Sequence, residues 1–583
     1  MPPQTQSPRK KILMAICLIG LAVIVALVLI YGGKNPGSTA SLGHLPKHLR
    51  PLPRYSSKPL CGVARKGYAQ CAAYVATGQN SQPAAVTPGT TSLNGPVQFH
   101  TAYQLPCTPG GPVQGVCAAP SSFGPTIAIV DAGSYGLGTG TIDNSLNFYD
   151  NYYGLPACTT SNGCLTVVNQ SGAASPLPAN IDDSWSHEIA LDVQAAHMVC
   201  QTCKIVLVEA NDNAIANLVA ATTTAATFNP VAISESWFDS TGDDTTFDSK
   251  LNIPGTAVVA AAGDSGSANV DWPADSPNVI AAAGTTLQLN TDNSWAAETV
   301  WSSSGGTCSK NYTAPAWQTN LSNWGSLACG AKRSFGDVSA DADPNSGAYI
   351  WMGTDTANGG SWWGMGGTSL SSPIIASIFG LVGKVPTSVQ SSAIPYGSFT
   401  AANFHDITGG SNCANSLTGA ACTAAAGFDT PSGLGSPLGA GGFSPPPAAP
   451  TNLHQTSATD TGIGLAWTAA TGNVAISGYH IYRNGTLIAT QSGTSFSDSG
   501  LSKNTSYTYA VSAYDALGNI SAQATASLST AKTGDLNGDG QVNATDLNLF
   551  LTNYSSKSAN LDLNGDGNVD VLDLSVMLRV FGS

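Results

Sequence analysis

Short apolar runs alternate with longer mixed stretches along residues 98–443. Three of these runs, 126–130, 204–208 and 257–261, contain no charged residue beyond the Lys that opens the second. Continuous apolar runs of this length are typical of strands buried on both faces. Between them, residues 184–199 have the length and composition of a helix. Strands that alternate with helices predict an α/β domain, with a parallel sheet and helices on both of its faces.

The pattern changes after residue 443. Residues 444–450 form a Pro-rich run that predicts a stiff linker. Residues 451–532 then show short alternating strands separated by turns, which predict an all-β sandwich. This region resembles a fibronectin type III domain, with Trp467 in the core and Tyr507 as its tyrosine corner. A spacer function fits such a domain better than catalysis.

Residues 533–583 contain an internal repeat of acidic loops, each followed by an apolar helix. The spacing of oxygen-bearing side chains, with Gly at the sixth position, matches the calcium loop of an EF-hand. The predicted ligands are Asp535, Asn537, Asp539, Gln541 and Asp546 in the first loop, and Asp562, Asn564, Asp566, Asn568 and Asp573 in the second. Two such loop–helix units resemble a small α-helical type I dockerin. The resemblance implies two Ca²⁺ ions and a cohesin-bearing partner; the alternative is a calcium fold that binds no partner.

The N-terminal part predicts export. Residues 12–31 carry no charge and follow a basic cluster, which favours a transmembrane signal-anchor with residues 1–11 as a cytoplasmic tail. The alternative is a long signal peptide cleaved near residues 38–40, which would leave a secreted protein. Residues 32–97 are rich in Pro, Ser, Gly and Thr and predict a low-complexity stalk.

Cysteine spacing and charge agree with an exported protein. Of the 13 cysteines, all but Cys17 fall into close sequence pairs, which predicts local disulfides in an oxidising environment. The pairs are Cys61/Cys71, Cys107/Cys117, Cys158/Cys164, Cys200/Cys203, Cys308/Cys329 and Cys413/Cys422. A metal site at residues 200–203 is disfavoured because no second ligand pair lies at a suitable spacing. The net charge of −14 argues against nucleic acid as a partner.

The sequence 366–373, Gly-Gly-Thr-Ser-Leu-Ser-Ser-Pro, predicts a sharp turn into a helix. An apolar run follows at 374–379, and Pro373 suits the first turn of a helix. Ser369 would then lie at a helix N-terminus, where backbone N–H groups favour developing negative charge. These features make Ser369 a candidate nucleophile.

A serine nucleophile needs a base, and carboxyl groups are the better candidates here. Glu188 and Asp192 lie four residues apart on one predicted helix, so they share a face, and Glu188 could take the serine proton while Asp192 orients it. Asp264 follows the strand 257–261, and a protonated carboxyl there could donate to an oxyanion. None of the nearby histidines lies in the His-Gly-Thr context of subtilisins. These histidines are His100, His187, His197 and His405.

Taken together, these motifs resemble the sedolisin family of serine-carboxyl peptidases over residues 98–443. The motifs are residues 366–373, 185–192, 234–237, 263–266 and 272–285. The resemblance implies a subtilisin-like fold, acid pH preference and polypeptide substrates. It implies Ser369 as nucleophile, Glu188 as base, Asp192 as its partner and Asp264 as the oxyanion acid. It also implies one Ca²⁺ site, formed by Asp406, Ile407, Gly427 and Asp429.

Two other functions stay open. The α/β domain could be a catalytically silent adhesion or scaffold module on the cell surface. Alternatively, Asp131 resembles the aspartate at a strand end of subtilisins, so the domain could be a neutral serine peptidase that uses Asp131 and a histidine. Members of the sedolisin family usually carry a large folded prosegment, whereas only residues 32–97 separate the apolar stretch from the peptidase unit here.

Overall fold

The computed structural model describes residues 49–50, 52, 55–77, 93–137, 140–240, 245–353, 360–413, 419, 421–554 and 558–583. The chain divides into residues 1–49 and 50–583, and the description below concerns the second unit. The predicted tail 1–11 and apolar span 12–31 lie outside the described residues. Within the described ranges, no helix has both the length and the apolar character needed to cross a bilayer.

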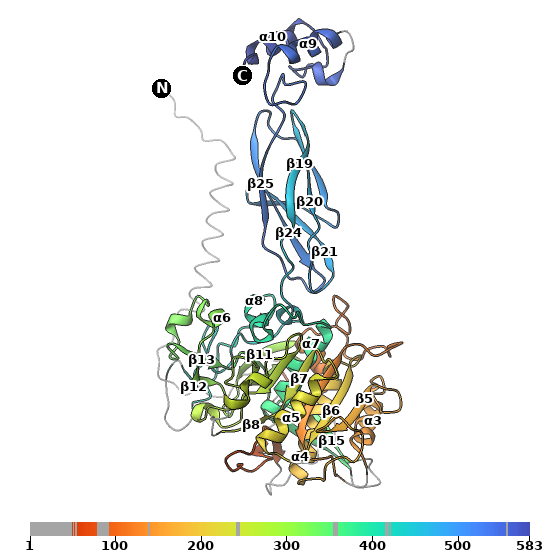
Figure 1. The fold of residues 1–583 in the computed structure, drawn as a ribbon, viewed down its shortest axis with the longest axis vertical. Helices are drawn as coiled ribbons and strands as arrows, with labels where there is room; N and C mark the ends of the chain where they lie inside the picture. The colour runs from red at the N-terminus through yellow and green to blue at the C-terminus, as the bar shows by residue number, and fades with distance from the viewer. Residues whose placement is uncertain are drawn as a thin grey trace, which may run out of the picture. The chain divides into compact units, whose positions relative to one another are not determined.

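An eight-stranded sheet forms the centre of the α/β domain (Figure 1). Its strands are β4 (Thr126–Ala132), β5 (Leu165–Asn169), β6 (Lys204–Ala210), β7 (Ala232–Glu235), β9 (Ala257–Ala261), β10 (Ile280–Leu289), β11 (Trp295–Val300) and β14 (Val338–Asp341). The order is β11-β10-β9-β7-β4-β6-β5, with β14 also paired to β10. All pairs are parallel except β10 with β11. The predicted runs at 126–130, 204–208 and 257–261 are therefore confirmed as β4, β6 and β9.

Consecutive residues of β4, β7 and β9 are buried, so both faces of the sheet are covered. The covering helices include α3 (Ile142–Tyr153), α4 (Asp183–Val199), α5 (Ile215–Ala226) and α7 (Thr368–Val382). The carboxylate of Asp182 caps α4 by accepting the N–H of Trp185. Helices α4 and α7 pack against each other and against the central strands. The predicted α/β fold with a parallel sheet is confirmed.

Smaller elements complete this domain. They are β8 (Trp237–Phe238), β12 (Thr307–Thr313), β13 (Lys332–Phe335), β15 (Ala348–Met352), β16 (Ser361–Gly366), β17 (Phe404–His405), β18 (Ser436–Pro437), α2 (Pro96–Ala102), α6 (Ala316–Thr319) and α8 (Ile394–Gly397). All six predicted cysteine pairs are joined as disulfides. Each bridge closes a short loop and so restricts the unfolded chain locally.

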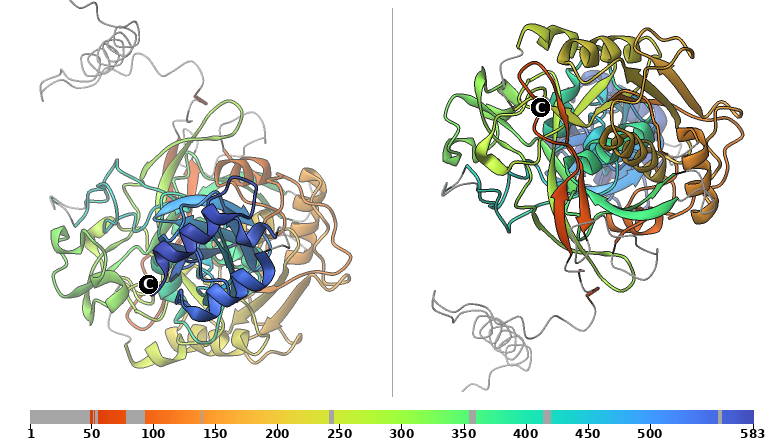
Figure 2. Two further views of the ribbon diagram at one scale, coloured as in Figure 1. Left: turned by 90° about the horizontal axis from the view of Figure 1, so that it is seen from above. Right: turned by 90° about the horizontal axis from the view of Figure 1, so that it is seen from below.

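Part of the predicted stalk is folded into the α/β domain. Residues 55–77 contain β1 (Ser56–Pro59), β2 (Gln70–Cys71) and β3 (Tyr74–Thr77). Strand β3 pairs with β1 and β16, while β2 pairs with β8. Figure 2 shows these strands in red, lying across the α/β domain. The expectation of a low-complexity stalk is therefore wrong for this segment, because its small apolar residues find strand partners far away in the sequence.

Residues 451–529 form a two-sheet β-sandwich. One sheet has β19 (Thr451–Thr459), β20 (Gly462–Thr468) and β23 (Ser495–Ser499); the other has β22 (Thr486–Gln491), β21 (Ile476–Arg483), β24 (Ser506–Asp515) and β25 (Ala524–Ser529). Trp467 is buried in the core between the sheets, as predicted. The hydroxyl of Tyr507 accepts the N–H of Ser502 at 2.9 Å, which is the predicted tyrosine corner.

The last described part of the chain consists of two loop–helix units. Its helices are α9 (Ala544–Asn553) and α10 (Val571–Val580). Phe550 and Met577, one from each helix, are fully buried in a small core that also contains Val542. The repeat seen in the sequence is therefore a repeat of structure.

Candidate active site

Ser369 lies at the N-terminus of α7, as the sequence predicts. The cap residue Gly367 has φ of 91°, and a Cβ there would come within 2.1 Å of the Ala72 carbonyl oxygen. Only glycine therefore fits this turn. The Ser369 N–H points out of the helix and donates to the Ala72 carbonyl at 3.0 Å. Its hydroxyl donates to the Ser236 carbonyl at 3.4 Å.

Helix α7 begins earlier than predicted. Its first residue is Thr368, so Pro373 lies inside the helix and not in its first turn. A proline there cannot donate to the carbonyl four residues before it, which belongs to Ser369. The Ser236 hydroxyl donates to that carbonyl instead, at 3.4 Å. Ser236, between β7 and β8, thus contacts the candidate nucleophile through both its backbone and its side chain.

Three buried carboxyl groups interact with one another, and one of them, Glu188, also interacts with Ser369. Glu188 and Asp192 are fully buried on α4, and Asp131 is fully buried at the end of β4. Burial, followed by the charges of Asp192 and Asp131, raises the pKa of Glu188 well above its usual range, while the Ser369 hydroxyl acts to lower it. The pKa of Asp192 is also raised, by burial and then by Asp131. The ionisation of each group therefore affects that of its neighbours.

The Glu188 carboxyl group interacts with the Ser369 hydroxyl, but the two do not form a hydrogen bond. The Ser369 hydroxyl influences the pKa of Glu188, yet within the described ranges neither carboxylate oxygen of Glu188 has a partner at hydrogen-bond distance. Contacts between a serine and its base are often long in the absence of substrate.

Asp264 lies three residues after β9 and contacts Thr368, the residue before Ser369. Its Oδ1 accepts the N–H of Thr368 at 2.8 Å and the Thr368 hydroxyl at 2.9 Å. Its Oδ2 has no such partner among the described residues and faces the turn at Gly367. Burial raises the pKa of Asp264 to about 8, against the opposing effect of the Thr368 bonds. The group therefore holds a proton at acid and neutral pH.

The histidines lie elsewhere. His187 stacks on Trp363 with ring centroids 4.4 Å apart, and His197 is bonded to Asp150 through Nδ1 at 2.7 Å. His100 bonds to backbone carbonyls, and His405 stacks on Trp295. Across the described parts of the chain, no histidine forms a hydrogen bond with Ser369. The arrangement therefore offers carboxyl groups, and no imidazole, as the base.

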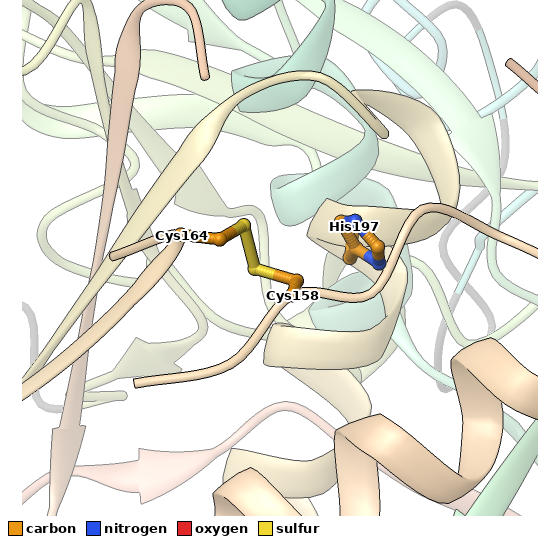
Figure 3. A group of neighbouring side chains, drawn as sticks. All are labelled: Cys158, Cys164 and His197. Atoms are coloured by element: carbon orange, nitrogen blue, oxygen red, sulfur yellow. A yellow bond between two sulfur atoms is a disulfide. The ribbon is translucent and has the colours of Figure 1, made fainter. Parts of the chain in front are cut away.

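One other cluster has the composition of a metal site. Cys158, Cys164 and His197 bring their sulfur and nitrogen atoms close together (Figure 3). The two sulfurs are joined in a disulfide, and Nδ1 of His197 is bonded to Asp150. A thiolate is the form of cysteine that binds metal. In the oxidised chain this cluster is consequently a structural contact.

The predicted calcium ligands of the α/β domain lie near one another. A carboxylate oxygen of Asp406 accepts the N–H of Gly427, and Asp429 accepts the N–H of Ala425 at 2.8 Å. Burial raises the pKa of Asp429 to about 7, and the charge of Asp406 adds to this effect. The two carboxylates, with the backbone carbonyls that Ile407 and Gly427 could add, are the hard oxygen donors that Ca²⁺ prefers. The residues present fit such an ion.

The predicted ligands of the first C-terminal loop also converge. Carboxylate oxygens of Asp535, Asp539 and Asp546 all lie within 4.8 Å of one another. The buried Asp546 accepts the N–H groups of Leu536 and Asn543 and holds the loop closed. The second loop repeats this pattern, with Asp573 accepting the N–H groups of Asn564 and Asp570. Both loops therefore fit Ca²⁺ by the chemistry of their oxygen donors.

Sequence reasoning missed three contacts of the site. Thr368 fixes Asp264, Ser236 contacts Ser369, and Ala72 accepts the Ser369 N–H. Thr368 and Ser236 lie inside motifs that the sequence does single out, at 366–373 and 234–237. Ala72 lies in a segment of small and apolar residues, and no motif in that segment indicates a contact with Ser369.

Comparison with known proteins supports this description. Residues 448–527 match the model of the fibronectin type III domain, and residues 533–581 match that of the dockerin type I domain. Kumamolisin from a Bacillus species is 29% identical over 405 residues, which cover 63% of this chain and 64% of that protein. Sedolisin from a Pseudomonas species is 33% identical over 184 residues, which cover 29% of each chain.

Two further matches concern parts of the chain. An alpha-amylase of Niallia circulans is 48% identical over 89 residues, which cover 15% of this chain and 7% of the enzyme. A solved structure of Pseudomonas sedolisin, a serine-carboxyl proteinase, covers 60% of this chain and 96% of its own, with 23% identity and a TM-score of 0.48. The chain spans less than two thirds of the length of each of these curated relatives. The chain is homologous to sedolisin and kumamolisin and carries fibronectin type III and dockerin modules at its C-terminal end.

Proposed function

We propose that this chain is an exported serine-carboxyl endopeptidase of the sedolisin type, which hydrolyses polypeptides at acid pH. The observation that carries the proposal is the setting of Ser369. It lies at a helix N-terminus and interacts with the buried Glu188, which in turn interacts with Asp192, Asp131 and Asp264. The homology to kumamolisin and sedolisin points to the same chemistry.

In this mechanism Ser369 attacks the substrate carbonyl carbon, and Glu188 takes the serine proton. Glu188 interacts with Asp192 and Asp131, so the proton that Glu188 takes up can be balanced by the loss of a proton from one of these two carboxyl groups. The oxyanion receives two donors, the N–H of Ser369 and the protonated carboxyl of Asp264. Glu188 then returns the proton to the leaving amine, and water releases the acyl group.

The oxyanion donor sets an upper pH limit for activity. Asp264 can donate only when it is protonated, and its pKa of about 8 sets the upper limit of that state. At the acid end, the rate falls when the whole group of Glu188, Asp192 and Asp131 has taken up protons, since no base is then left. The pH–rate profile is therefore a bell.

The pH–rate profile of the full chain with Ca²⁺ on a denatured protein substrate tests the proposal. Ser369→Ala should abolish the activity, whereas Ser377→Ala on the same helix should retain it. Glu188→Ala should lower the rate by about 10³-fold or more, as loss of a general base does. Loss of activity on Asp131→Ala with Glu188→Ala still active would instead favour the neutral peptidase. Inactivity at every pH would favour the scaffold function.

The remaining modules suggest where the enzyme works. Fibronectin type III and dockerin modules suggest an extracellular protein, and we propose that the dockerin binds Ca²⁺ in both loops and tethers the enzyme to a cohesin-bearing protein. We propose a third Ca²⁺ ion at Asp406, Ile407, Gly427 and Asp429. The apolar stretch 12–31 would hold the chain in a membrane. Recovery of the native chain in the membrane fraction, against release into the medium after signal cleavage, distinguishes the two localisations.

A further inference from the structure

A second loop holds the segment that carries Asp264. This loop, residues 303–306, connects β11 to β12 and lies against residues 263–267. The Gly305 N–H donates to the Gly263 carbonyl at 2.5 Å, and another backbone hydrogen bond, of 2.9 Å, also joins the two segments. The place of the Asp264 carboxyl group therefore depends on the 303–306 loop.

The loop and the end of β9 are in direct backbone contact. A Cβ on Gly305 would come within 1.7 Å of the Ala262 carbonyl oxygen, so no side chain fits between them. The loop has the sequence Ser-Ser-Gly-Gly, which gives it small side chains and a backbone of high conformational freedom. The 303–306 loop therefore needs support from another part of the chain.

Asn412 supplies that support. Its side chain is fully buried, and its Nδ2 donates to three successive carbonyls of the loop, those of Ser304 at 2.9 Å, Gly305 at 3.1 Å and Gly306 at 2.8 Å. The backbone carbonyl of Asn412 also accepts the N–H of Ser267 at 2.9 Å. Asn412 is thus bonded to both segments at once.

An amide group suits this place chemically. A backbone carbonyl only accepts hydrogen bonds, so the group that faces three of them must be a donor. The amide nitrogen of Asn412 brings two hydrogens, whereas a hydroxyl would bring one and a carboxylate none. Since an unpaired carbonyl is costly in a buried site, the loop is most stable with this side chain present.

A disulfide fixes the position of Asn412 itself. The next residue, Cys413, is joined to Cys422, and the Asn412 N–H donates to the Cys422 carbonyl at 3.0 Å. Beside this contact, Ser411 and Thr423 pair as an antiparallel bridge. The two chains that flank Asn412 are therefore held together on both sides of it.

We propose that Asn412 is a positioning residue for the oxyanion acid. It holds the 303–306 loop against residues 263–267 and so keeps the carboxyl group of Asp264 where the oxyanion forms. The inference rests on the proposed function and adds to it a residue that acts through Asp264. A donor stabilises an oxyanion only from hydrogen-bond distance, and a displacement of about 1 Å is enough to slow a reaction severely.

Steady-state kinetics of the full chain on a peptide at acid pH, with Ca²⁺, gives the first test. Asn412→Ala should lower kcat by about tenfold or more and leave KM within about twofold, because the oxyanion contact is made in the transition state. Asn94→Ala is the matched control. It removes another buried amide, which donates to the Ser346 carbonyl, and should leave kcat unchanged. A wild-type kcat in Asn412→Ala would overturn the inference.

A double-mutant cycle distinguishes positioning from a general loss of structure. In Asp264→Ala there is no oxyanion acid left to position. Adding Asn412→Ala to this variant should therefore change the remaining kcat by less than about twofold. An equal tenfold fall in both backgrounds would show that Asn412 acts on another part of the site and would contradict the proposal.

Hydrogen exchange gives a test that needs no activity. In the Ser369→Ala chain, Asn412→Ala should speed exchange at the Thr368 amide by about tenfold or more, because that N–H donates to Asp264. Asn94→Ala should leave this exchange unchanged. Exchange that stays slow in Asn412→Ala overturns the inference, whatever the activity of the wild type.

The outcomes separate this inference from the proposed function. A wild type that is inactive at every pH overturns the proposed function, while faster exchange in Asn412→Ala would still identify Asn412 as the support of Asp264. An active wild type with unchanged exchange and kcat in Asn412→Ala overturns the inference alone.

A second variant covers the case in which Asn412→Ala does not fold. Cys413→Ser with Cys422→Ser removes the bridge beside Asn412 and keeps its amide, so it replaces Asn412→Ala in all three tests with the same expected directions. Its control is Cys107→Ser with Cys117→Ser, which opens a loop of similar length elsewhere in the domain. Equal kcat and equal exchange in these two double variants would overturn the inference.

Discussion

A carboxyl group donates a hydrogen bond only while it holds its proton, and this property makes Asp264 the most informative single residue. Thr368 occupies its Oδ1, so Oδ2 is the atom left to carry the proton towards Ser369. Tyr74, Asp271 and Glu188 are the other titratable groups that interact with it. Burial raises the pKa of each of these three groups.

Asp264→Asn tests this assignment. The wild type should lose activity as the pH rises through the pKa of about 8, because Asp264 then becomes a carboxylate that repels the oxyanion. An asparagine amide donates at every pH, so the variant should keep part of its activity and lose this alkaline limb. Asp264→Ala should lower kcat by about 10²-fold or more at all pH values. An unchanged alkaline limb in Asp264→Asn would assign it to another group.

Much of the site is readable at the residue scale, because its chemistry lies in compact motifs. Ser369, Glu188 and Asp264 each stand in a distinctive local sequence, and the structure gathers them although they lie on α7, α4 and the end of β9. The contact of Ala72 cannot be predicted from the sequence. It is made by the backbone carbonyl, which every residue has, so the identity of the side chain gives no indication of it.

At the scale of elements, prediction succeeds where the partners are local. The short apolar runs of the sheet, the helix α4 and the six disulfides all follow from nearby residues. The strands β2 and β3 do not, because they pair with β8 and β16, more than 160 residues away, and the mostly exposed β1 pairs with β3. The early start of α7 is not predicted either, because a proline inside a helix needs Ser236, far away in the sequence, to donate to the carbonyl that Pro373 leaves free.

The two loops of the dockerin should bind Ca²⁺ as separate elements. Asp539 and Asp566 are exposed and occupy equivalent positions in the two loops, so each can be changed without removing a buried side chain. Asp539→Asn should weaken one site by about tenfold through the loss of one charge, and Asp566→Asn should weaken the other. Isothermal titration of the full chain measures both. Asp292→Asn, in an exposed turn of the α/β domain, is the control and should change neither site.

At the scale of the whole molecule, the α/β domain contains many buried carboxyl groups. Burial raises the pKa of Asp131 and Asp264 to about 8, and those of Glu209, Glu235 and Asp275 to about 7. A carboxyl whose folded pKa is raised binds more protons in the native state than in the unfolded one. Its contribution to the free energy of unfolding is fully present below its pKa in the unfolded chain, which is near 4, and is lost as the pH rises through its pKa in the folded chain.

This domain should therefore unfold more easily in mild alkali than in mild acid. Between pH 4.5 and pH 8, we expect the Tm of this domain in Ser369→Ala to fall by about 5 °C or more. The contribution of each buried carboxyl group to the free energy of unfolding falls by up to about 1.4 kcal/mol per pH unit. Scanning calorimetry in excess Ca²⁺ measures this, and Ser369→Ala prevents self-digestion. An equal or higher Tm at pH 8 would show that these groups are ionised in the folded chain.

The segment 55–77 connects the apolar stretch 12–31 to the α/β domain, and it is part of that domain. Strand β1 pairs with β3, β2 pairs with β8, and β3 pairs with β16. If the stretch 12–31 holds the chain in a membrane, the attachment reaches the domain through paired strands and not through a free stalk. A protease that cut the chain before residue 55 would release the whole domain, whereas one cut between β2 and β3 would leave the two pieces joined by the β1–β3 and β2–β8 pairs.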